Sequence, residues 1–286
     1  NRPMEQLATG YGLVEGPTWH PTKGLLYSDV LNGGVFALAA DGSISTAVPH
    51  RKGIGGIVLH EADGIVVGGR NLSFKSFDGD RSIVLLDNDV TDITVGFNDF
   101  TTDFKGRIYA GSLAFKVFGG GAPKPGHLHI IDLDGSVRTL ADGVMLTNGM
   151  GFSPDSKLFY HADARDDVIR VYDVSDDGGV GPWRPFVKTP PEAHADGLAV
   201  AEDGSVWTAM AHGSRVDVYE PDGSLRKSLP VPLPMVTSVC FGGDDLMDLY
   251  VVTGSRGGPH ENCGSVYKTR ADVPGLPIAA ARVTLG

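Results

Sequence analysis

The chain has 286 residues, a formal net charge of −11 and 41% hydrophobic residues, with 40 glycines and 18 prolines. The acidic balance argues against nucleic acid or an anionic membrane surface as partner, because both are bound through excess Lys and Arg. No apolar run reaches the roughly 20 residues of a membrane-spanning helix. The two cysteines are too few for a disulfide framework or a zinc cluster. We expect a cytoplasmic protein.

One pattern recurs along the chain: a head residue, a short apolar run, a turn rich in Asp, Gly, Pro or Ser, and a second apolar run. Successive heads are 41, 42, 50, 48 and 41 residues apart. Periods of about 40 to 50 residues that hold several short strands are typical of β-propeller blades. The pattern therefore predicts an all-β fold, a six-bladed propeller forming a single domain over residues 1–286. The six heads are Glu15, Gly56, Asn98, Asn148, Asp196 and Thr237.

The two ends of the chain predict how the ring closes. Residues 4–10 resemble the segment that precedes Asn148, and no earlier strands are available to form a blade with them. We therefore assign this segment to the sixth blade as its last strand, so that strands from both termini close the propeller and remove its open edges. A further strand over residues 281–285 is expected in the same blade.

Turns and loops follow the same repeat. Asp-Gly pairs such as Asp41-Gly42 and Asp222-Gly223 fit short hairpin turns, because both residue types tolerate positive φ. Residues 115–126, with their Gly-Gly-Gly run, are predicted to form an extended surface loop. Cys240 lies in an apolar run and is interpreted as an ordinary buried residue.

The heads of the blades carry the predicted chemistry. The first strand of each propeller blade lines the central channel, so the head side chains converge near the axis. Glu15 and Asp196 supply two carboxylates, and Asn98 and Asn148 supply two carboxamides. Such oxygen ligands suit Ca²⁺ foremost, with Mg²⁺ or Mn²⁺ as alternatives. Zn²⁺ is a further alternative, although it more usually recruits His or Cys. Asn-Gly and Asp-Gly pairs are also ordinary turns, but four polar heads at equivalent positions favour a metal site.

Several of these segments together carry a family resemblance. They are residues 15–19, 147–155, 196–200 and 237–243. In the order and spacing of these segments, the chain resembles the SMP-30/gluconolactonase/luciferin-regenerating-enzyme family over almost its whole length. The resemblance implies one metal ion in the central channel and hydrolysis, usually of sugar lactones and in some relatives of phosphorus esters.

The resemblance also implies roles for single residues. Glu15, Asn148 and Asp196 match the family's metal ligands, and Asn98 matches an Asn that reaches the substrate or the metal. A cation there would polarise the lactone carbonyl and lower the pKa of a bound water, and Asp196 would orient or deprotonate that water as the catalytic base.

The chain departs from the family pattern beside Asn98. Gly96 stands where sugar-lactone members often have Arg, and Phe100 stands where they have Gly. The loss of a donor for sugar hydroxyls, together with Phe97 and Phe100, predicts a less polar lactone or ester as substrate, with Phe100 as a substrate contact. Apolar residues of the loop after Leu113 agree with this, although they would equally pack on the propeller.

Three histidines follow or precede the expected inner strands. His194 lies two residues before Asp196, near the expected channel mouth, and is predicted to contact substrate. His161 and His212 follow apolar strands and are interpreted as structural.

Two other functions stay open from the sequence. One is a propeller that binds calcium or another ligand without turnover, because fold alone does not decide function. The other is a phosphotriester hydrolase with the same metal ligands. In either hydrolase the partner is a small-molecule lactone or ester, and we expect a monomer or small homo-oligomer.

Overall fold

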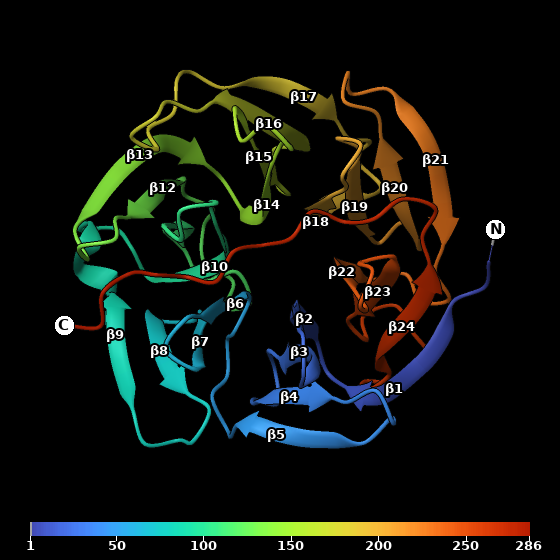
Figure 1. Ribbon diagram of the computed structural model, residues 1–286. Helices are drawn as coiled ribbons and strands as arrows, with labels where there is room; N and C mark the ends of the chain where they lie inside the picture. The colour runs from blue at the N-terminus through green and yellow to red at the C-terminus, as the bar shows by residue number, and fades with distance from the viewer. Residues whose placement is uncertain (1) are drawn as a thin grey trace.

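The computed structural model describes residues 2–286, and these form six four-stranded antiparallel sheets arranged around a central axis (Figure 1). The predicted all-β, six-bladed propeller is confirmed. The described residues contain a single short helix, the 3₁₀ turn η1 (Asn88–Val90), and no helix that is long and apolar enough to cross a membrane.

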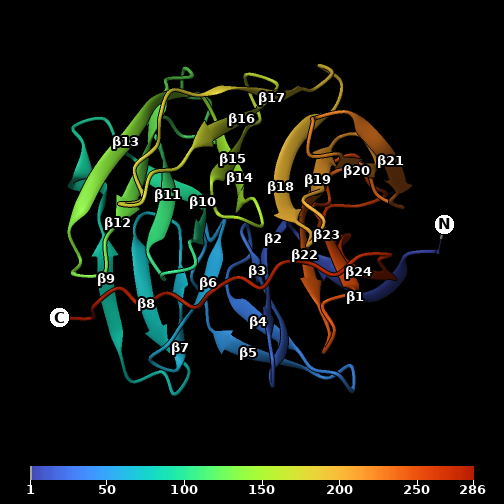
Figure 2. The same cartoon turned by 45° about the horizontal axis from the view of Figure 1, so that its top comes forward.

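Each sheet is a meander whose first strand lies at the axis and whose last lies at the periphery (Figures 1 and 2). The first two sheets contain β2 (Val14–His20), β3 (Gly24–Asp29), β4 (Val35–Leu38) and β5 (Ile44–Val48), then β6 (Ile57–His60), β7 (Gly64–Val67), β8 (Leu72–Ser76) and β9 (Ser82–Leu86). The next two contain β10 (Gly96–Thr102), β11 (Ile108–Leu113), β12 (Gly126–Ile131) and β13 (Val137–Val144), then β14 (Thr147–Phe152), β15 (Leu158–Asp163), β16 (Val168–Asp173) and β17 (Arg184–Lys188).

The fifth sheet contains β18 (His194–Val200), β19 (Val206–Ala211), β20 (Arg215–Tyr219) and β21 (Leu225–Pro230). The sixth joins the two ends of the chain: β22 (Val236–Gly242), β23 (Asp248–Thr253) and β24 (Gly264–Arg270) are completed at the outer edge by β1 (Glu5–Tyr11), which pairs with β24. The predicted closure by the amino-terminal segment is confirmed.

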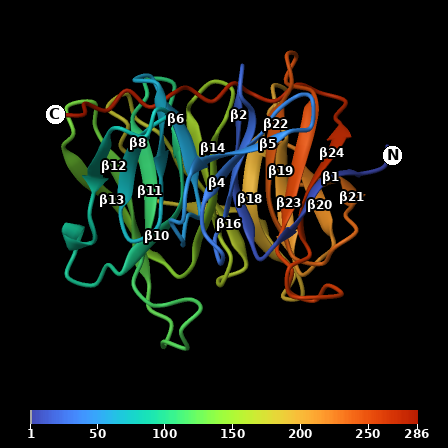
Figure 3. The same ribbon diagram turned by 90° about the horizontal axis from the view of Figure 1, so that it is seen from below.

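The segment after β24 does not form the strand expected over residues 281–285. It crosses the face of the propeller instead, from the sixth sheet over the axis to the second and third (Figures 1 and 3). Ala281 pairs with the end of β6, and Arg282 N donates to Gly106 O. The prediction of a further strand in the sixth sheet was therefore wrong. Because β1 already covers the outer edge of β24, that sheet offers no free edge near this segment.

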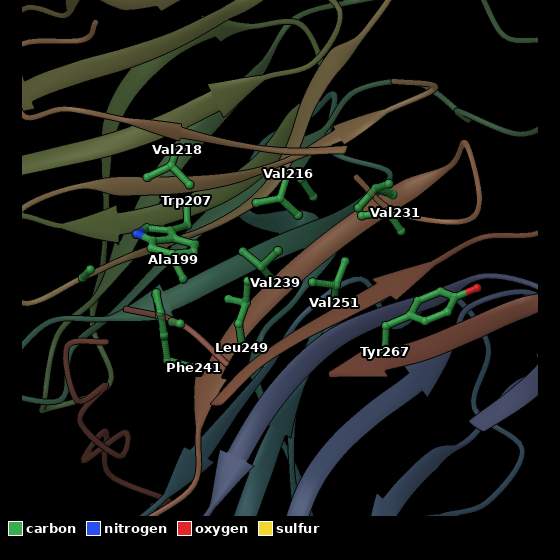
Figure 4. Close-up of a cluster of buried hydrophobic side chains, with 14 residues drawn as sticks. Ala199, Trp207, Val216, Val218, Val231, Val239, Phe241, Leu249, Val251 and Tyr267 are labelled. Carbon is green, nitrogen blue, oxygen red and sulfur yellow. The ribbon is translucent and has the colours of Figure 1, made fainter. Parts of the chain in front are cut away.

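The cores of the propeller lie between neighbouring sheets. Between the fifth and sixth sheets, Trp207 is fully buried and its ring meets that of Phe241 edge to face at 5.3 Å (Figure 4). Val239 and Val251 of the sixth sheet belong to the same cluster. Removing a fully buried aromatic side chain of this kind costs about 3–5 kcal/mol. These cores hold the sheets in fixed positions around the axis, and so they fix the first residues of the inner strands.

Candidate active site at the propeller axis

The inner strands are irregular where the polar heads lie. The strand register shifts between Glu15 and Thr18 in β2, and equivalent shifts bracket the heads of β10, β14, β18 and β22. A β-bulge takes residues out of the ladder and re-aims their side chains. β6 has no such irregularity, and its head is Gly56. The bulges therefore release the heads of β10, β14, β18 and β22 from regular pairing at the channel, whereas Glu15 still pairs with Ser28 directly before the bulge in β2.

Two buried aspartates fix the loops that lead into the inner strands. The carboxylate of Asp29, at the end of β3, accepts hydrogen bonds from the backbone of Gly12 and Leu13. Asp163, at the end of β15, does the same for Met145 and Leu146. These contacts hold the chain just before Glu15 and Asn148 in place.

We use the name axial set for Glu15, Asn98, Asn148 and Asp196. Two of its members touch directly: Asn98 Nδ2 donates to Asn148 Oδ1 at 2.8 Å and to Thr147 O at 2.7 Å. Asn98 itself packs on a glycine, because a Cβ added to Gly55 would lie 2.0 Å from Asn98 Oδ1. The two carboxamides are thus held in one arrangement by neighbouring blades.

The carboxylates of the axial set act on each other. Burial, followed by the negative charges of Asp196 and Asp99, raises the pKa of Glu15 well above its usual value. Desolvation in the channel and the charge of Asp99 raise the pKa of Asp196 in the same way. Burial raises the pKa of Asp99 to about 7. Three carboxylates from three blades are therefore close enough to repel one another, which disfavours their joint ionisation without a compensating cation.

Asp99 was not given a role from the sequence. It follows Asn98 directly, and the Asn-Asp pair in the third repeat was the available signal. Its Oδ1 accepts a hydrogen bond from Phe100 N, and the side chain lies close to where a Cβ on Gly56 would be. The glycine head of the second blade thus leaves room for a third carboxylate.

The sixth head, Thr237, has a structural role. It is fully buried, and its Oγ1 donates to Val14 O and Val252 O. It therefore ties the inner strand of the sixth sheet to that of the first, next to Glu15.

The chemistry of the axial set fits a hard divalent cation. Glu15 Oε2 is buried and has no hydrogen-bond partner among the described residues, so the fold presents a carboxyl oxygen that is free to bind a cation. Within residues 2–286 no three His, Cys, Asp or Glu side chains are grouped to hold an ion by themselves. A cation would therefore need the amide oxygen of Asn148 and water beside Glu15 and Asp196, as Ca²⁺ sites commonly use.

His194 is held by a residue that the sequence did not indicate. Its Nδ1 lies 2.7 Å from Asp167 Oδ1, and its ring stands perpendicular to that of His212 at 6.2 Å. Asp167 lies in the turn between β15 and β16 with φ 51°, and nothing in its spacing pointed to this contact. The structural interpretation of His161 is confirmed, because it is fully buried and its Nε2 bonds Thr147 Oγ1.

The aromatic residues beside Asn98 point away from the channel mouth. Phe97 is buried in a core cluster, so it does not make the site less polar, and that part of the prediction was wrong. Phe100 is also buried, and it lines a cavity on the far side of the axial set. Substrate contact by Phe100 stays a prediction.

A hollow of about 870 Å³ lies next to the segments that precede the heads. We call it the outer hollow. Gly12, Leu13 and Met235 lie in its wall, just before the heads of the first and sixth blades. Val117 and Phe118, from the predicted loop after β11, face Arg256 and neighbouring residues of the loop after β23 across it. The loop therefore forms one wall of an opening that combines apolar and charged side chains.

Comparison with known proteins shows the family to which the chain belongs. Residues 13–255 match the family described as SMP-30/Gluconolactonase/LRE-like region. The chain is 30% identical to the pentonolactonase XacC of Haloferax volcanii, over 97% of both chains, and 32% identical to the 6-deoxy-6-sulfogluconolactonase of Pseudomonas putida, over 92% of both. A solved structure of a calcium-binding protein, regucalcin, from Agrobacterium tumefaciens has the same fold, with a TM-score of 0.87 at 20% identity over 98% of both chains. The chain belongs to the SMP-30/gluconolactonase/LRE-like family, as the sequence motifs predicted.

Proposed function

We propose that this chain is a lactonase that uses one divalent cation to open a sugar lactone by hydrolysis. The observation that carries the proposal is the axial set, in which two carboxylates and two amides meet and Glu15 Oε2 is buried without a hydrogen-bond partner among the described residues. The two curated relatives, both named as lactonases, support the class of enzyme.

Glu15, Asn148 and Asp196 would hold the cation, with Ca²⁺ favoured by the all-oxygen donor set. When bound, the cation supplies Lewis-acid polarisation of the lactone carbonyl and lowers the pKa of a water ligand. It would also offset the repulsion that raises the pKa of Glu15 and Asp196.

The remaining roles belong to the protein's own side chains. Asp196 would accept the proton of the attacking water as the general base, because its carboxylate lies in the axial set beside the position proposed for the cation. Asn98, fixed by Asn148 and Gly55, would orient the substrate with its amide. His194, held by Asp167, would donate a hydrogen bond to a substrate oxygen at the mouth of the channel.

The outer hollow bears on the choice of lactone. Asn32, Asn262 and Arg256 offer groups that can bind sugar hydroxyls, although the Arg of sugar-lactone members is absent at Gly96. Val117 and Phe118 add an apolar wall. We place sugar lactones first and keep less polar cyclic esters as the alternative. The cytoplasmic location and the monomeric or small homo-oligomeric state stay predictions.

The test is hydrolysis of a panel of lactones by protein stripped of metal with a chelator. Aldonolactones, γ- and δ-alkyl lactones and one phosphotriester would be assayed with Ca²⁺, Mg²⁺, Mn²⁺ or Zn²⁺ added back. We expect metal-restored lactone hydrolysis, a loss of at least about 10³-fold in kcat/KM for Asp196→Ala, and no loss for Asp222→Ala, an exposed Asp-Gly turn residue. No turnover of any substrate by metal-loaded protein would favour the binding-protein alternative.

The role of Asp196 as base needs a second variant. Asp196→Asn keeps an oxygen ligand but cannot accept the proton, so we expect it to bind the cation measurably and turn over at least about 10²-fold more slowly. Normal turnover by this variant with metal bound would rule out Asp196 as the base.

A further inference from the structure

A second cavity, of about 720 Å³, lies on the opposite side of the axial set from the outer hollow. We call it the inner cavity. Its wall includes Gly16, Met150 and Leu198, which follow the heads Glu15, Asn148 and Asp196 along their strands. The outer hollow is lined instead by Gly12, Leu13 and Met235, which precede heads, and by the loops after β3, β11 and β23. None of the axial set lines either space, and Glu15 lies between Leu13, which lines the outer hollow, and Gly16, which lines the inner cavity.

The inner cavity is largely apolar and has no positive charge. Trp19, Ile57, Phe100, Val239 and Phe241 lie in its wall. No Lys, Arg or His of the described residues lines it, whereas Asp99, Asp103 and Asp244 do. An anionic molecule would meet only like charge there, and an uncharged apolar molecule would bury its surface against matching side chains.

The far end of the cavity is formed by the carboxy-terminal segment. Leu276 N donates to Val200 O, and Thr102 Oγ1 donates to Ala279 O, so residues 276–279 are fixed across the opening. Figure 3 shows this segment running along the face opposite the extended loop after β11. The channel is thus partly closed at the end remote from the outer hollow.

Large apolar side chains stand exposed at this end. Ile278 and Phe104 both line the inner cavity, yet they are 62% and 67% exposed to solvent. Phe104 comes from the turn between β10 and β11, and Ile278 from the crossing segment. Exposed apolar side chains at the rim of an apolar cavity are typical of an entrance for an apolar ligand. A bound ligand would remove their apolar surface from water, which is favourable.

We propose that the inner cavity is a second binding site for a small uncharged apolar molecule, an alkyl or aromatic compound carrying at most a hydroxyl group. It goes beyond the proposed hydrolysis, which uses the other side of the axial set. The volume lies in the range of ordinary small-molecule sites, roughly 300–1,000 Å³. Thr101 at its wall could bond a single hydroxyl.

The test uses two probes of one chain length, 1-octanol and octanoate, with the intact protein at neutral pH. Trp19 lies in the wall of the cavity, so its fluorescence reports on occupancy, and Trp19→Phe should abolish the change. Titration calorimetry serves as the second measurement. We expect saturable binding of 1-octanol and at least tenfold weaker binding of octanoate. Equal binding of the two probes, or no binding of 1-octanol by calorimetry, would overturn the proposal.

The site is located with a matched pair of variants. Ile278→Asp places a charge at the rim, and Leu225→Asp places one at a similarly exposed position on β21, which does not line the cavity. Both side chains are exposed, so both variants should fold. We expect Ile278→Asp to weaken 1-octanol binding at least tenfold and Leu225→Asp to leave it unchanged. Equal effects of the two variants would place the probe elsewhere, whatever the outcome of the lactone assay.

Discussion

Asn98 and Asn148, which come from the inner strands of the third and fourth sheets, are joined by a hydrogen bond of 2.8 Å from Asn98 Nδ2 to Asn148 Oδ1. The bond orients the oxygen that is proposed to hold the cation. A second bond, from Asn98 Nδ2 to Thr147 O, fixes the same side chain to the backbone of the fourth sheet. The packing of the two sheets therefore brings together two heads that lie 50 residues apart in the sequence.

We expect Asn98→Leu to lower kcat/KM for the preferred lactone by about 10- to 10²-fold, because Asn148 loses its orienting donor and the substrate loses an amide. The measurement is steady-state kinetics together with cation affinity. Asn88→Leu, at an exposed residue of η1, is the control and should have no effect. Reduced cation affinity would show that Asn98 acts through the metal site, whereas a rise in KM alone would assign it to the substrate.

Gly55→Ala tests the packing that holds Asn98. The new Cβ would lie 2.0 Å from Asn98 Oδ1, so the amide must move. Since a displacement of about 1 Å can cost about 10²-fold in rate, we expect a loss of that order in kcat. Gly181→Ala is the matched control, because its Cβ would meet nothing within 4 Å and its φ is not positive. Full activity of Gly55→Ala would mean that Asn98 has no positional role.

Glu15→Gln tests the electrostatic cost of the axial set. The pKa of Glu15 in the folded state is raised, so the folded state binds more protons than the unfolded state as the pH rises above about 4.5. Metal-free protein should therefore lose stability as the pH rises through the folded pKa. We expect metal-free Glu15→Gln to have a higher Tm than the wild type at pH 8 and the same Tm at pH 4.

Cation binding should affect the Tm of the wild type and of Glu15→Gln differently. Added Ca²⁺ should raise the Tm of the wild type at pH 8 and leave that of Glu15→Gln nearly unchanged, because the variant lacks the anionic ligand. Glu5→Gln, at an exposed position of β1, is the control and should follow the wild type throughout. A metal-free variant that is less stable than the wild type at pH 8 would contradict the proposed repulsion.

His161→Gln tests a buried neutral histidine. Burial lowers the pKa of His161 to about 3, so between about pH 6.5 and pH 3 the unfolded state binds the extra proton and stability falls as the pH falls. The wild type should lose about 2 kcal/mol of unfolding free energy through this group between pH 8 and pH 5. We expect urea denaturation to show that His161→Gln is less sensitive to acid by about that amount, whereas His260→Gln, at an exposed residue, behaves as the wild type. Equal acid sensitivity of His161→Gln and the wild type would contradict the lowered pKa.

Local patterns explain what the sequence could predict. The repeat from Glu15 to Thr237 placed six inner strands, because apolar runs and Asp-Gly turns specify strands and hairpins from neighbouring residues alone. Polar heads at equivalent positions then predicted that Glu15, Asn98, Asn148 and Asp196 would face the axis. The strand at residues 4–10 precedes the first complete repeat, and this likewise predicted its place in the sixth blade, where β1 pairs with β24.

Contacts between distant segments decided the rest. The bulges in the inner strands depend on the register between neighbouring strands. The charge effect of Asp99 on Glu15 and the contact of His194 with Asp167 depend on residues from other blades or turns. Residues 281–285 alternate apolar and polar side chains as a strand does. Because β1 already occupies the outer edge of the sixth sheet, they lie across the face of the propeller instead, where Ala281 pairs with β6. Sequence alone thus determined the repeat and the residue types at the axis, because these follow from short-range pattern. The tertiary structure decided the orientation of the axial side chains, the effects of their charges on one another and the presence of the inner cavity, because these arise where separate blades meet.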